Sequence, residues 1–468
     1  MVSIFDFAKY KDAVAVITDS GKTFTYNALD VFAGKIGKYL HSRNLVFCFC
    51  KNEIGALAGY CSFLQKGVVP VLLDATKDTE SLQTLLDIYQ PQWIWLPQNT
   101  YHSEWGEIVF QDLDYALVKH NSQPVPMPEE LALLLTTSGS TGSPKLVRLT
   151  YRNVLSNAEC IAEYLNIDAN ERPVTSLPVY YSYGISVINS HLIKGATILL
   201  TDKTVVQKEF WTFAKEQRAS SIAGVPYTYE MLKRLRLFRM DLPALKTLTQ
   251  AGGKLNAELA KEYIEQSIAT GRRFFVMYGQ TEATARMSYL PFERALEKYG
   301  SIGIAIPRGK FTLIDEAGKE IDEPDKDGEL VYSGPNVSLG YAEDKKDLAK
   351  SDENNEILYT GDIARRDADG FYYITGRKKR FVKLFGNRVN LDAIEQIVKT
   401  IVLSSASVGT DDMVTIFTTD KNKEDEIKSL LAKKTGLNIR AFAVQVIDTI
   451  PKNDSGKVQY EELNKLVK

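Results

Sequence analysis

Short apolar runs alternate with amphipathic segments through the first part of the chain, and this alternation restricts the possible folds more than any other feature. Residues 13–18 and 45–50 have the length and composition of strands, whereas residues 27–41 and 54–65 have the apolar spacing of helices. Further short buried strands are expected at 68–73, 93–96 and 107–109. Strands that alternate with helices are typical of layered α/β folds. The sequence therefore predicts an α/β fold with a substantial parallel sheet.

The pattern of expected strands and helices changes twice in the rest of the chain. A second α/β stretch has expected helices at 153–165 and 208–216 and expected strands at 196–200, 221–224 and 274–277. From 310 to 374, short strands and turns are expected, punctuated by Gly318, Gly328, Gly334, Gly361 and Gly370. A last unit begins near Lys379 and has its own strands and helices, in the segments 391–398, 423–434 and 460–467. We therefore predict a large domain over 1–378 and a small α+β domain over 379–468, with a hinge at 376–380.

Bulk composition disfavours several classes of protein. With 468 residues, the chain is too long for one compact core. Its formal net charge of −2 gives no long-range field that would attract nucleic acid or an anionic membrane. No apolar run approaches the roughly 20 residues of a membrane span, and the first residues do not read as a signal peptide. Cys48 and Cys50 should share one face of a strand, and Cys61 and Cys160 are isolated, so no disulfide framework is expected. Such cysteine usage is typical of a protein in a reducing cytoplasm.

Residues 136–145 read TTSGSTGSPK and directly follow the apolar run 131–135, so a buried strand should end there and a loop should follow it. Backbone N–H groups and hydroxyls of such a loop can face an anion, and Lys145 adds a positive charge. A flexible surface loop is the alternative, which the preceding strand and the Pro144–Lys145 ending disfavour. The loop is not a Walker A motif, because Pro144 precedes the lysine and Leu146 follows it. A P-loop kinase or GTPase is therefore disfavoured.

This loop resembles the phosphate loop of the adenylate-forming enzymes, the superfamily of acyl-CoA and aryl-CoA synthetases, adenylation domains of nonribosomal peptide synthetases and firefly luciferase. Similar segments follow in the superfamily's order: 224–232 (GVPYTYEML), 251–255 (AGGKL), 278–282 (YGQTE), 328–341 (GELVYSGPNVSLGY), 359–362 (YTGD), 376–395 (GRKKRFVKLFGNRVNLDAIE) and 451–457 (PKNDSGK). The resemblance spans most of the chain. It implies a large AMP-binding domain of layered α/β subdomains with a small β-barrel-like part, and a small mobile α+β C-terminal domain.

The resemblance also implies an ATP site. Tyr278 would stack on adenine, Thr281 would bind the α-phosphate, and Glu282 would hold Mg²⁺. Asp362 would accept both ribose hydroxyls, and Arg377 would donate to the same sugar. Thr281 could also cap a following helix. The remaining residues of the implied nucleotide site are Thr137, Ser138, Gly139, Ser140, Thr141, Gly142, Lys145, Gly252, Gly253, Gly279 and Gln280.

Two half-reactions are implied by the same resemblance. Lys457 would be the catalytic lysine of adenylation, because its charge can stabilise charge that builds up in the in-line transition state. The small domain would then rotate about Lys379, and a segment that includes Lys383 and Gly386 would shape the thiol site.

Residues 177–187 read LPVYYSYGISV, and the corresponding region lines the acyl pocket in the superfamily. Tyr180, Tyr181 and Tyr183, together with Gly253, would form a pocket with aromatic walls and hydroxyl tips. The alternative is that only one tyrosine faces the ligand and the others are packing residues. No carboxylate lies between Pro173 and Ile188, which disfavours a free α-amino acid.

The expected function is ATP-dependent activation of an aryl or short to medium acyl acid, with transfer to a thiol, most readily CoA. The expected cofactors are therefore ATP, Mg²⁺ and CoA. A freestanding adenylation enzyme that loads the phosphopantetheine of a separate carrier protein is the near alternative. A catalytically inactive nucleotide-binding protein on the same fold is the alternative from another class. The sequence offers nothing specific for a luciferase-like oxygenase.

Overall fold

The computed structural model describes residues 4–121, 123–136, 145–384, 387–402, 404–410, 413–452 and 458–467. The chain forms two compact units, each of which is described by itself. Unit 1 comprises Met1–Lys310 and Tyr332–Leu358, and unit 2 comprises Phe311–Val331 and Tyr359–Lys468.

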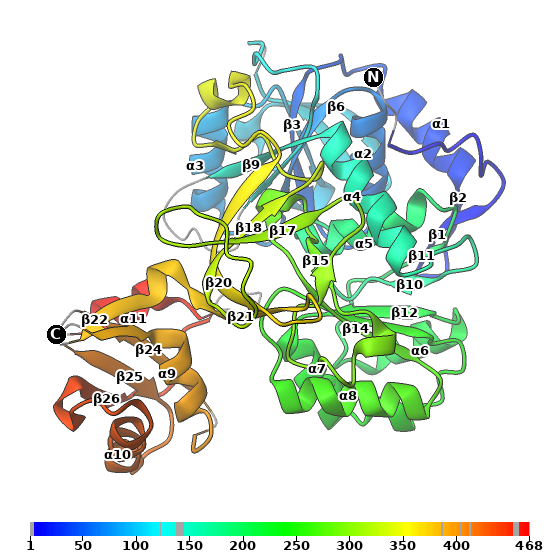
Figure 1. The fold of residues 1–468 in the computed structure, drawn as a ribbon. Coiled ribbons are helices and arrows are strands. Elements are labelled where there is room, and N and C mark those ends of the chain that lie inside the picture. Colours follow the sequence, from blue (N-terminus) through cyan, green and yellow to red (C-terminus); the bar gives the residue numbers. More distant parts are fainter. Residues whose placement is uncertain are drawn as a thin grey trace. The chain divides into compact units, whose positions relative to one another are not determined.

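Unit 1 contains an eight-stranded sheet with a parallel centre (Figure 1). Strands β8, β4, β3 and β5 run parallel to one another, whereas the strands outside them pair antiparallel. In spatial order the strands are β19 (Tyr341–Ala342), β9 (Leu146–Thr150), β8 (Leu131–Thr136), β4 (Val69–Asp74), β3 (Leu45–Cys50), β5 (Trp93–Pro97), β7 (Tyr115–Lys119) and β6 (Glu107–Asp112).

A nine-stranded sheet forms the second sheet of unit 1. Its order is β16 (Ile304–Ala305), β15 (Ser288–Tyr289), β14 (Arg273–Tyr278), β13 (Thr247–Gln250), β12 (Ser221–Gly224), β10 (Pro173–Val174), β11 (Ile198–Leu200), β1 (Val14–Thr18) and β2 (Thr23–Thr25). From β14 to β1 each pair of neighbours is parallel. The carboxyl ends of β12, β13 and β14 therefore meet at one edge, which is where open α/β sheets bind ligands.

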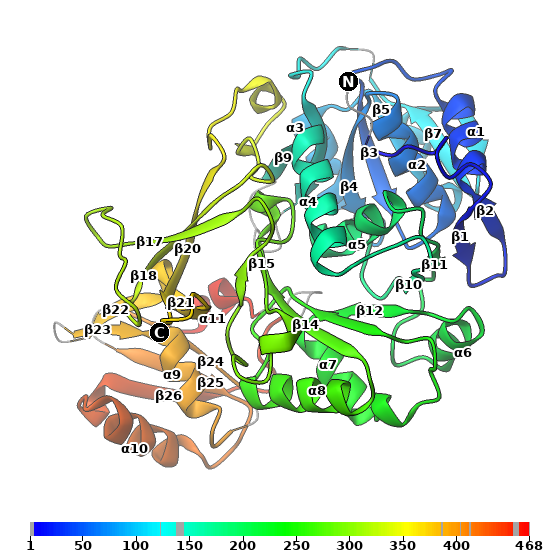
Figure 2. The ribbon, with the colours of Figure 1, turned by 45° about the vertical axis from the view of Figure 1, so that its right-hand side comes forward.

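Helices cover both sheets. The helices α1 (Tyr26–Ile36), α2 (Ile54–Gln65), α4 (Tyr151–Tyr164) and α5 (Ser182–Leu192) share a core with Val46, Cys48 and Cys50 on one face of β3. Helix α3 (Thr79–Tyr89) packs against the opposite face of that strand, through Phe47 and its neighbours. The nine-stranded sheet carries α6 (Lys208–Glu216), α7 (Pro226–Arg234) and α8 (Ala257–Ala269), and Figure 2 shows α7 and α8 on the face opposite to α5.

Burial and capping contacts explain where the helices begin and end. Every residue from Ile54 to Leu64 of α2 is buried, and the helix has the predicted bounds although no side chain caps its start. Helix α1 is shorter than predicted, since it ends at Ile36 and the backbone N–H of Gly37 closes its last turn. Helix α4 begins with a reciprocal capping box between Thr150 and Asn153.

The segment Tyr332–Leu358 belongs to unit 1 because Arg148 of β9 binds it. The side chain of Arg148 has no solvent exposure, and its Nη2 lies 2.8 Å from Oε2 of Glu353. The same guanidinium donates to the carbonyl oxygens of Leu339, Lys350 and Ser351. One buried cation on β9 thus has four acceptors from a segment that is remote in sequence.

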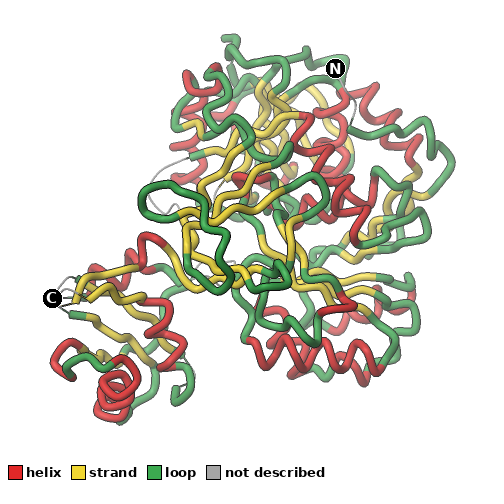
Figure 3. The backbone as a smooth tube through the Cα atoms, viewed as in Figure 1, coloured by secondary structure: helices red, strands yellow, loops and turns green. Residues whose placement is uncertain are grey.

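Unit 2 has two parts. The first part contains most of a four-stranded sheet. Its order is β17 (Lys310–Ile314), β18 (Gly328–Ser333), β20 (Ile357–Arg366) and β21 (Tyr372–Arg377). A hairpin of β22 (Phe381–Leu384) and β23 (Asn387–Asn390) follows this sheet in the chain. A three-stranded sheet of β24 (Ser405–Gly409), β25 (Val414–Thr418) and β26 (Phe442–Val446) follows, with the helices α9 (Leu391–Val398), α10 (Glu424–Thr435) and α11 (Tyr460–Leu466) (Figure 3).

A buried ionic cluster joins elements of unit 2. Nη2 of Arg380 lies 2.5 Å from Oε1 of Glu395, and its Nε lies 2.7 Å from Asp392. The ring of Tyr460 on α11 stacks 3.7 Å from the guanidinium, and its hydroxyl donates to Glu395. The residue after the predicted hinge lysine is therefore fixed to the C-terminal helix.

The predicted α/β fold class is confirmed. Strands β3 and β12 and the helices α2, α6 and α9 have the bounds expected from the sequence. Cys48 and Cys50 share a face as predicted, and all four cysteines are unpaired and buried. In the part of the chain that the structure describes, no helix has the length and apolar character needed to cross a membrane.

Candidate active site

The predicted site residues divide into those that the structure describes and those that it does not. The backbone of Lys379 lies in the short turn Lys378–Arg380, and that of Lys383 lies in β22. The predicted residues that lie outside the described part of the chain are Thr137, Ser138, Gly139, Ser140, Thr141, Gly142, Gly386 and Lys457.

Lys145 lies directly before β9 and faces the neighbouring strand β19. Its Nζ lies 2.7 Å from Oε1 of Glu343 and 5.2 Å from the ring centre of Tyr341. The pairing of β9 with β19, in which Tyr341 opposes Val147, places these groups beside one another. The side chain of Lys145 is 39% exposed, so a phosphate can approach it.

Glu282 lies on the other side of Tyr341. The short turn Thr281–Ala283 follows β14, and the hydroxyl of Tyr341 donates to Oε1 of Glu282 at 2.6 Å. Burial, followed by the negative charge of Glu282, raises the pKa of Tyr341 well above its usual range. The phenol therefore stays protonated and continues to donate to the carboxylate. Tyr341 ends one of the segments that resemble the superfamily, yet the sequence assigned it no role.

The turn around Glu282 is fixed by the segment 336–338. The backbone N–H of Ser338 donates to the carbonyl of Glu282 at 2.8 Å, and the amide of Asn336 donates to the carbonyls of Ala283 and Arg286. A Cβ on Gly279 would lie 1.7 Å from the carbonyl oxygen of Ala285, so only glycine fits there. No α-helix follows Thr281, whose hydroxyl instead lies 3.0 Å from that of Ser182, at the start of α5.

Aromatic hydroxyls surround the ends of β12 and β13. Tyr183 donates to both oxygen atoms of Thr249, and it is 3% exposed. Tyr180 donates to Asp74 at 2.9 Å. Tyr181 faces Gly252, where a Cβ would lie 2.6 Å from the tyrosine hydroxyl, and burial raises the pKa of Tyr181 to about 12. The structure thus brings Tyr181 and Gly252 together, and turns Tyr183 and Tyr180 toward protein partners.

Gly253 and Tyr278 lie at the same edge of the sheet. The side chain of Gln250 donates to the carbonyl of Gly253 at 2.9 Å, which shapes the turn after β13. The amide of Gln280 donates to the hydroxyl of Tyr278 at 3.2 Å. The turns that carry Gly252 and Gly253, and Gly279 to Thr281, therefore follow two adjacent parallel strands.

Asp362 and Arg377 form a pair within unit 2. They oppose each other on the antiparallel strands β20 and β21, and Nε of Arg377 lies 3.2 Å from Oδ1 of Asp362. The carboxylate is almost fully buried whereas the guanidinium is exposed. The arrangement presents one acceptor and one donor group together, as the sequence predicted.

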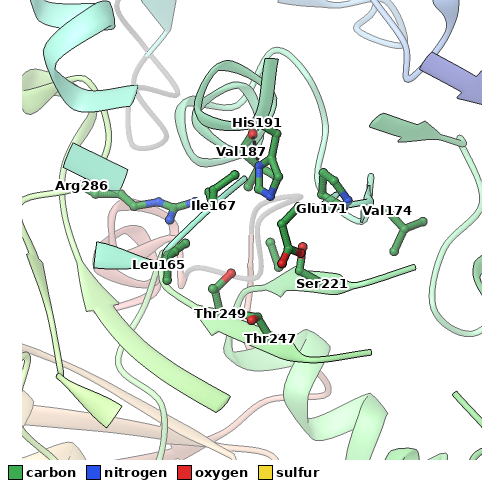
Figure 4. Close-up of a pocket in the computed structure, with 12 residues that line it drawn as sticks. Leu165, Ile167, Glu171, Val174, Val187, His191, Ser221, Thr247, Thr249 and Arg286 are labelled. Atoms are coloured by element: carbon green, nitrogen blue, oxygen red, sulfur yellow. Dashed lines mark hydrogen bonds between the residues drawn. The ribbon is translucent and has the colours of Figure 1, made fainter. Parts of the chain in front are cut away.

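A cavity that the sequence did not predict is lined by Thr247 and Thr249 of β13 (Figure 4). Its polar lining includes Arg286, His191 and Glu171, from three separate segments of the chain. Burial, with a smaller contribution from the charge of Arg286, lowers the pKa of His191 to about 4. The one signal in the sequence was Arg286 itself, a charge placed four residues after Glu282 among small and apolar neighbours.

Comparison with known proteins places these residues in context. Residues 6–342 match the family model described as AMP-binding enzyme. The long-chain-fatty-acid–CoA ligase of Escherichia coli O6:H1 is 30% identical over 358 residues, which cover 73% of this chain and 62% of that protein. The medium-chain fatty-acid–CoA ligase of Escherichia coli K12 is 23% identical over 499 aligned positions, which cover 96% of this chain and 86% of that protein.

Solved structures share the fold. The O-succinylbenzoate coenzyme A synthetase from Bacillus subtilis, in complex with AMP, matches with a TM-score of 0.80 at 20% identity, over 98% of this chain and 97% of that one. At this identity the likeness shows a common fold.

Proposed function

Because this chain belongs to the family of AMP-binding enzymes, we propose that it activates a carboxylic acid with ATP and transfers the acyl group to a thiol. The acid attacks the α-phosphate, pyrophosphate leaves, and an acyl-adenylate remains. A thiol then attacks the acyl carbon and releases AMP. CoA is the proposed thiol, since the relatives reported above are named as CoA ligases. A separate carrier protein is the second candidate.

The observation that carries this proposal is the position of Lys145 and Glu282 on either side of Tyr341. One cation and one carboxylate beside the ends of parallel strands suit the phosphates of ATP and the metal ion that accompanies them. Thr281, at the same turn, offers a hydroxyl to the α-phosphate.

Glu282 fits the expected Mg²⁺. Magnesium in nucleotide sites is typically held by one or two carboxylates, by phosphate oxygens and by water. Among the described residues, no group of three or more His, Cys, Asp or Glu side chains could form a protein-only metal site. A single carboxylate oriented by Tyr341 agrees with that pattern. When bound, the ion would neutralise part of the phosphate charge.

Unit 2 supplies the proposed sugar contacts. Asp362 is held by its partner strand and by Arg377, so its carboxylate is oriented before any ligand binds. We assign these two side chains to the ribose hydroxyls. The adenine would stack on Tyr278, and the acyl group would pass Gly252, Gly253 and Tyr181.

The small domain is proposed to take part in both half-reactions. Lys457 would act in adenylation, and rotation about Lys379 would bring Lys383 and Gly386 to the thiol. The domain boundary at 378/379 belongs to this proposal. The unpaired cysteines suit the proposed cytoplasmic location.

Half-reaction assays test the proposal. Lys457→Ala should abolish acid-dependent pyrophosphate exchange and largely spare thioester formation from supplied acyl-AMP. The exposed Lys452→Ala is the control and should retain both reactions. Equal loss of both reactions in Lys457→Ala would contradict the two-step assignment. No exchange by the native chain with any acid of a broad panel would favour an inactive nucleotide-binding protein.

Thiol identity needs a separate measurement. Product analysis with CoA and with a phosphopantetheinylated carrier protein distinguishes the two acceptors. Acyl-CoA as the product would support the proposal, and an acylated carrier with no acyl-CoA would contradict it.

A further inference from the structure

The cavity beside β13 has apolar walls and a polar lining whose members face one another. Its volume is about 20 Å³, enough for one or two water molecules, so a bound acid would have to widen it. In Figure 4, Arg286 and Glu171 enter from opposite sides and His191 lies above them. The walls include Leu165, Ile167, Val174 and Val187.

Arg286 is a buried cation without a carboxylate partner among the described residues. It is 2% exposed, and its Nη1 donates to the hydroxyl of Tyr164 at 3.1 Å and contacts Sδ of Met277 at 3.4 Å. Its guanidinium lies 4.9 Å from the ring centre of Tyr183. The buried Nε has no hydrogen-bond partner. Most of the donor capacity of this guanidinium is therefore unused.

Arg148 shows how this chain otherwise accommodates a buried arginine. That side chain is also inaccessible to solvent, but it contacts a carboxylate of Glu353 and three carbonyl oxygens. A buried charge normally needs such partners, because leaving water is costly. Nε of Arg148 also lacks a hydrogen-bond partner, so the contrast lies in the carboxylate and carbonyl acceptors, of which Arg286 has none among the described residues. This contrast indicates that Arg286 can meet an acceptor that comes from outside the chain.

The other polar groups of the cavity leave room for that acceptor. Glu171 accepts a hydrogen bond from Ser220 and forms no ion pair with Arg286. Nδ1 of His191 lies 2.7 Å from the carbonyl of Val187, so the neutral ring donates there and its Nε2 can act as an acceptor. Thr247 and Thr249 already accept hydrogen bonds from Arg273 and Tyr183.

The cavity and the proposed acyl path share strand β13 and are separated by the ring of Tyr183. Thr249 lies in the lining, and Gly252 and Gly253 follow it at the end of β13. The ring of Tyr183 packs edge-on against Tyr181 on one side and faces Arg286 on the other. An acid whose reacting carboxylate lies near Gly253 would therefore extend its far end toward Arg286.

We infer that Arg286 binds a second carboxylate at the far end of the acid, so that the substrate class is a dicarboxylic acid. This inference rests on the proposed function and specifies its substrate. Two oxygen atoms of the distal carboxylate would accept from Nε and Nη2, the bidentate geometry that guanidinium favours. The apolar walls would cover the carbon chain between the two ends.

Acids of matched length test this inference. Pyrophosphate release is measured with adipate, hexanoate and 6-aminohexanoate, and with dicarboxylates from succinate to suberate. We expect one dicarboxylate length to exceed the matched monocarboxylate in kcat/KM by about 10- to 100-fold, the range for hydrogen bonds between charged groups. Arg286→Met should lose that preference and retain its rate with the monocarboxylate, whereas Arg286→Lys should retain part of it.

Two control variants separate binding from structure. Arg234→Met removes an exposed arginine and should leave the preference unchanged. Arg148→Met removes a buried arginine that contacts one carboxylate and three carbonyl oxygens, and should lower the Tm by several degrees, whereas Arg286→Met should not lower it.

Several results would overturn the inference. They are equal rates for matched mono- and dicarboxylates, a preference that survives in Arg286→Met, and a preference for 6-aminohexanoate that is lost in Glu171→Gln. If no acid releases pyrophosphate, the proposed function fails, and calorimetry with the dicarboxylates still decides this point. Binding by the native chain that Arg286→Met abolishes would support a distal carboxylate site, and no binding or equal binding would refute it.

Discussion

The hydroxyl of Tyr341 donates a 2.6 Å hydrogen bond to the carboxylate of Glu282, although the two residues lie on separate segments of unit 1. The same ring lies 5.2 Å from the ammonium group of Lys145. A single aromatic side chain therefore contacts both charges that we assign to the metal and the phosphates. Its role is to position them, since it offers no charge of its own.

Tyr341→Phe should weaken the apparent affinity for Mg²⁺ about 10-fold, because a ligand carboxylate that loses its orienting donor binds metal less well. The free energy of unfolding should change by less than about 1 kcal/mol, since the side chain is partly exposed. A magnesium titration of pyrophosphate exchange measures the first effect. Tyr39→Phe, which alters a tyrosine of similar exposure, should leave the titration unchanged. An unaltered titration in Tyr341→Phe would contradict the positioning role.

Glu343→Gln should lower the KM for ATP about 2- to 5-fold. In the ligand-free chain Lys145 pairs with Glu343 at 2.7 Å, and a phosphate must compete with that exposed ion pair. The effect should shrink at high salt, because salt screens the pair in the native chain. Initial rates against ATP at two ionic strengths measure it, with Glu265→Gln as a control of equal charge change. A higher KM in Glu343→Gln would show that the glutamate assists the nucleotide instead.

Gly279→Ala should destabilise the chain by about 2–4 kcal/mol and reduce adenylation severely. The new Cβ would overlap the carbonyl of Ala285, so the turn that carries Thr281 and Glu282 must shift. Gly34→Ala provides the opposite case. Gly34 lies inside α1, and a Cβ there would have no neighbouring atom within 4 Å, so this substitution should stabilise the chain by about 0.5–1 kcal/mol. Urea unfolding and pyrophosphate exchange report on both variants. Native activity in Gly279→Ala would refute a fixed turn.

His191 should make stability depend on pH below neutrality. Burial lowers its pKa from 6.5 to about 4, so the unfolded chain takes up the proton first. The stabilisation is therefore complete above about pH 6.5 and is lost as the pH falls through about 4, a difference of about 3 kcal/mol. Between pH 7 and pH 4, the free energy of unfolding of the native chain should therefore fall by about 3 kcal/mol more than that of His191→Asn. Parallel curves for the two proteins would contradict this assignment.

Local pattern was sufficient for elements whose apolar period matched their burial. Strand β3 and helix α2 have their predicted bounds because nearly all of their residues are apolar and buried. Helix α5 was read as pocket lining, since its Ser, Tyr, Gly and Asn residues carry no strong helical signal. Its burial between other elements outweighs that weak propensity.

Residue motifs named candidate site residues but not the side chains that contact them. Asp362 and Arg377 are paired as expected, and their short separation in sequence makes a strand pair a natural link. Glu343 and Tyr341 meet Lys145 only because β19 pairs with β9, a contact that no local pattern encodes. The same holds for Arg286, whose cavity is formed by segments that are remote from it in sequence.

Arg148 has a consequence for the order in which this chain can fold during synthesis. Three of its acceptors, on Lys350, Ser351 and Glu353, follow residues 311–331, which belong to unit 2. A nascent chain that ends at Ala342 therefore contains only one of the four acceptors of Arg148, the carbonyl of Leu339. Unit 1 can be completed only after residues 311–331 of unit 2 have been translated, so the ion pair of Arg148 with Glu353 forms late in its synthesis.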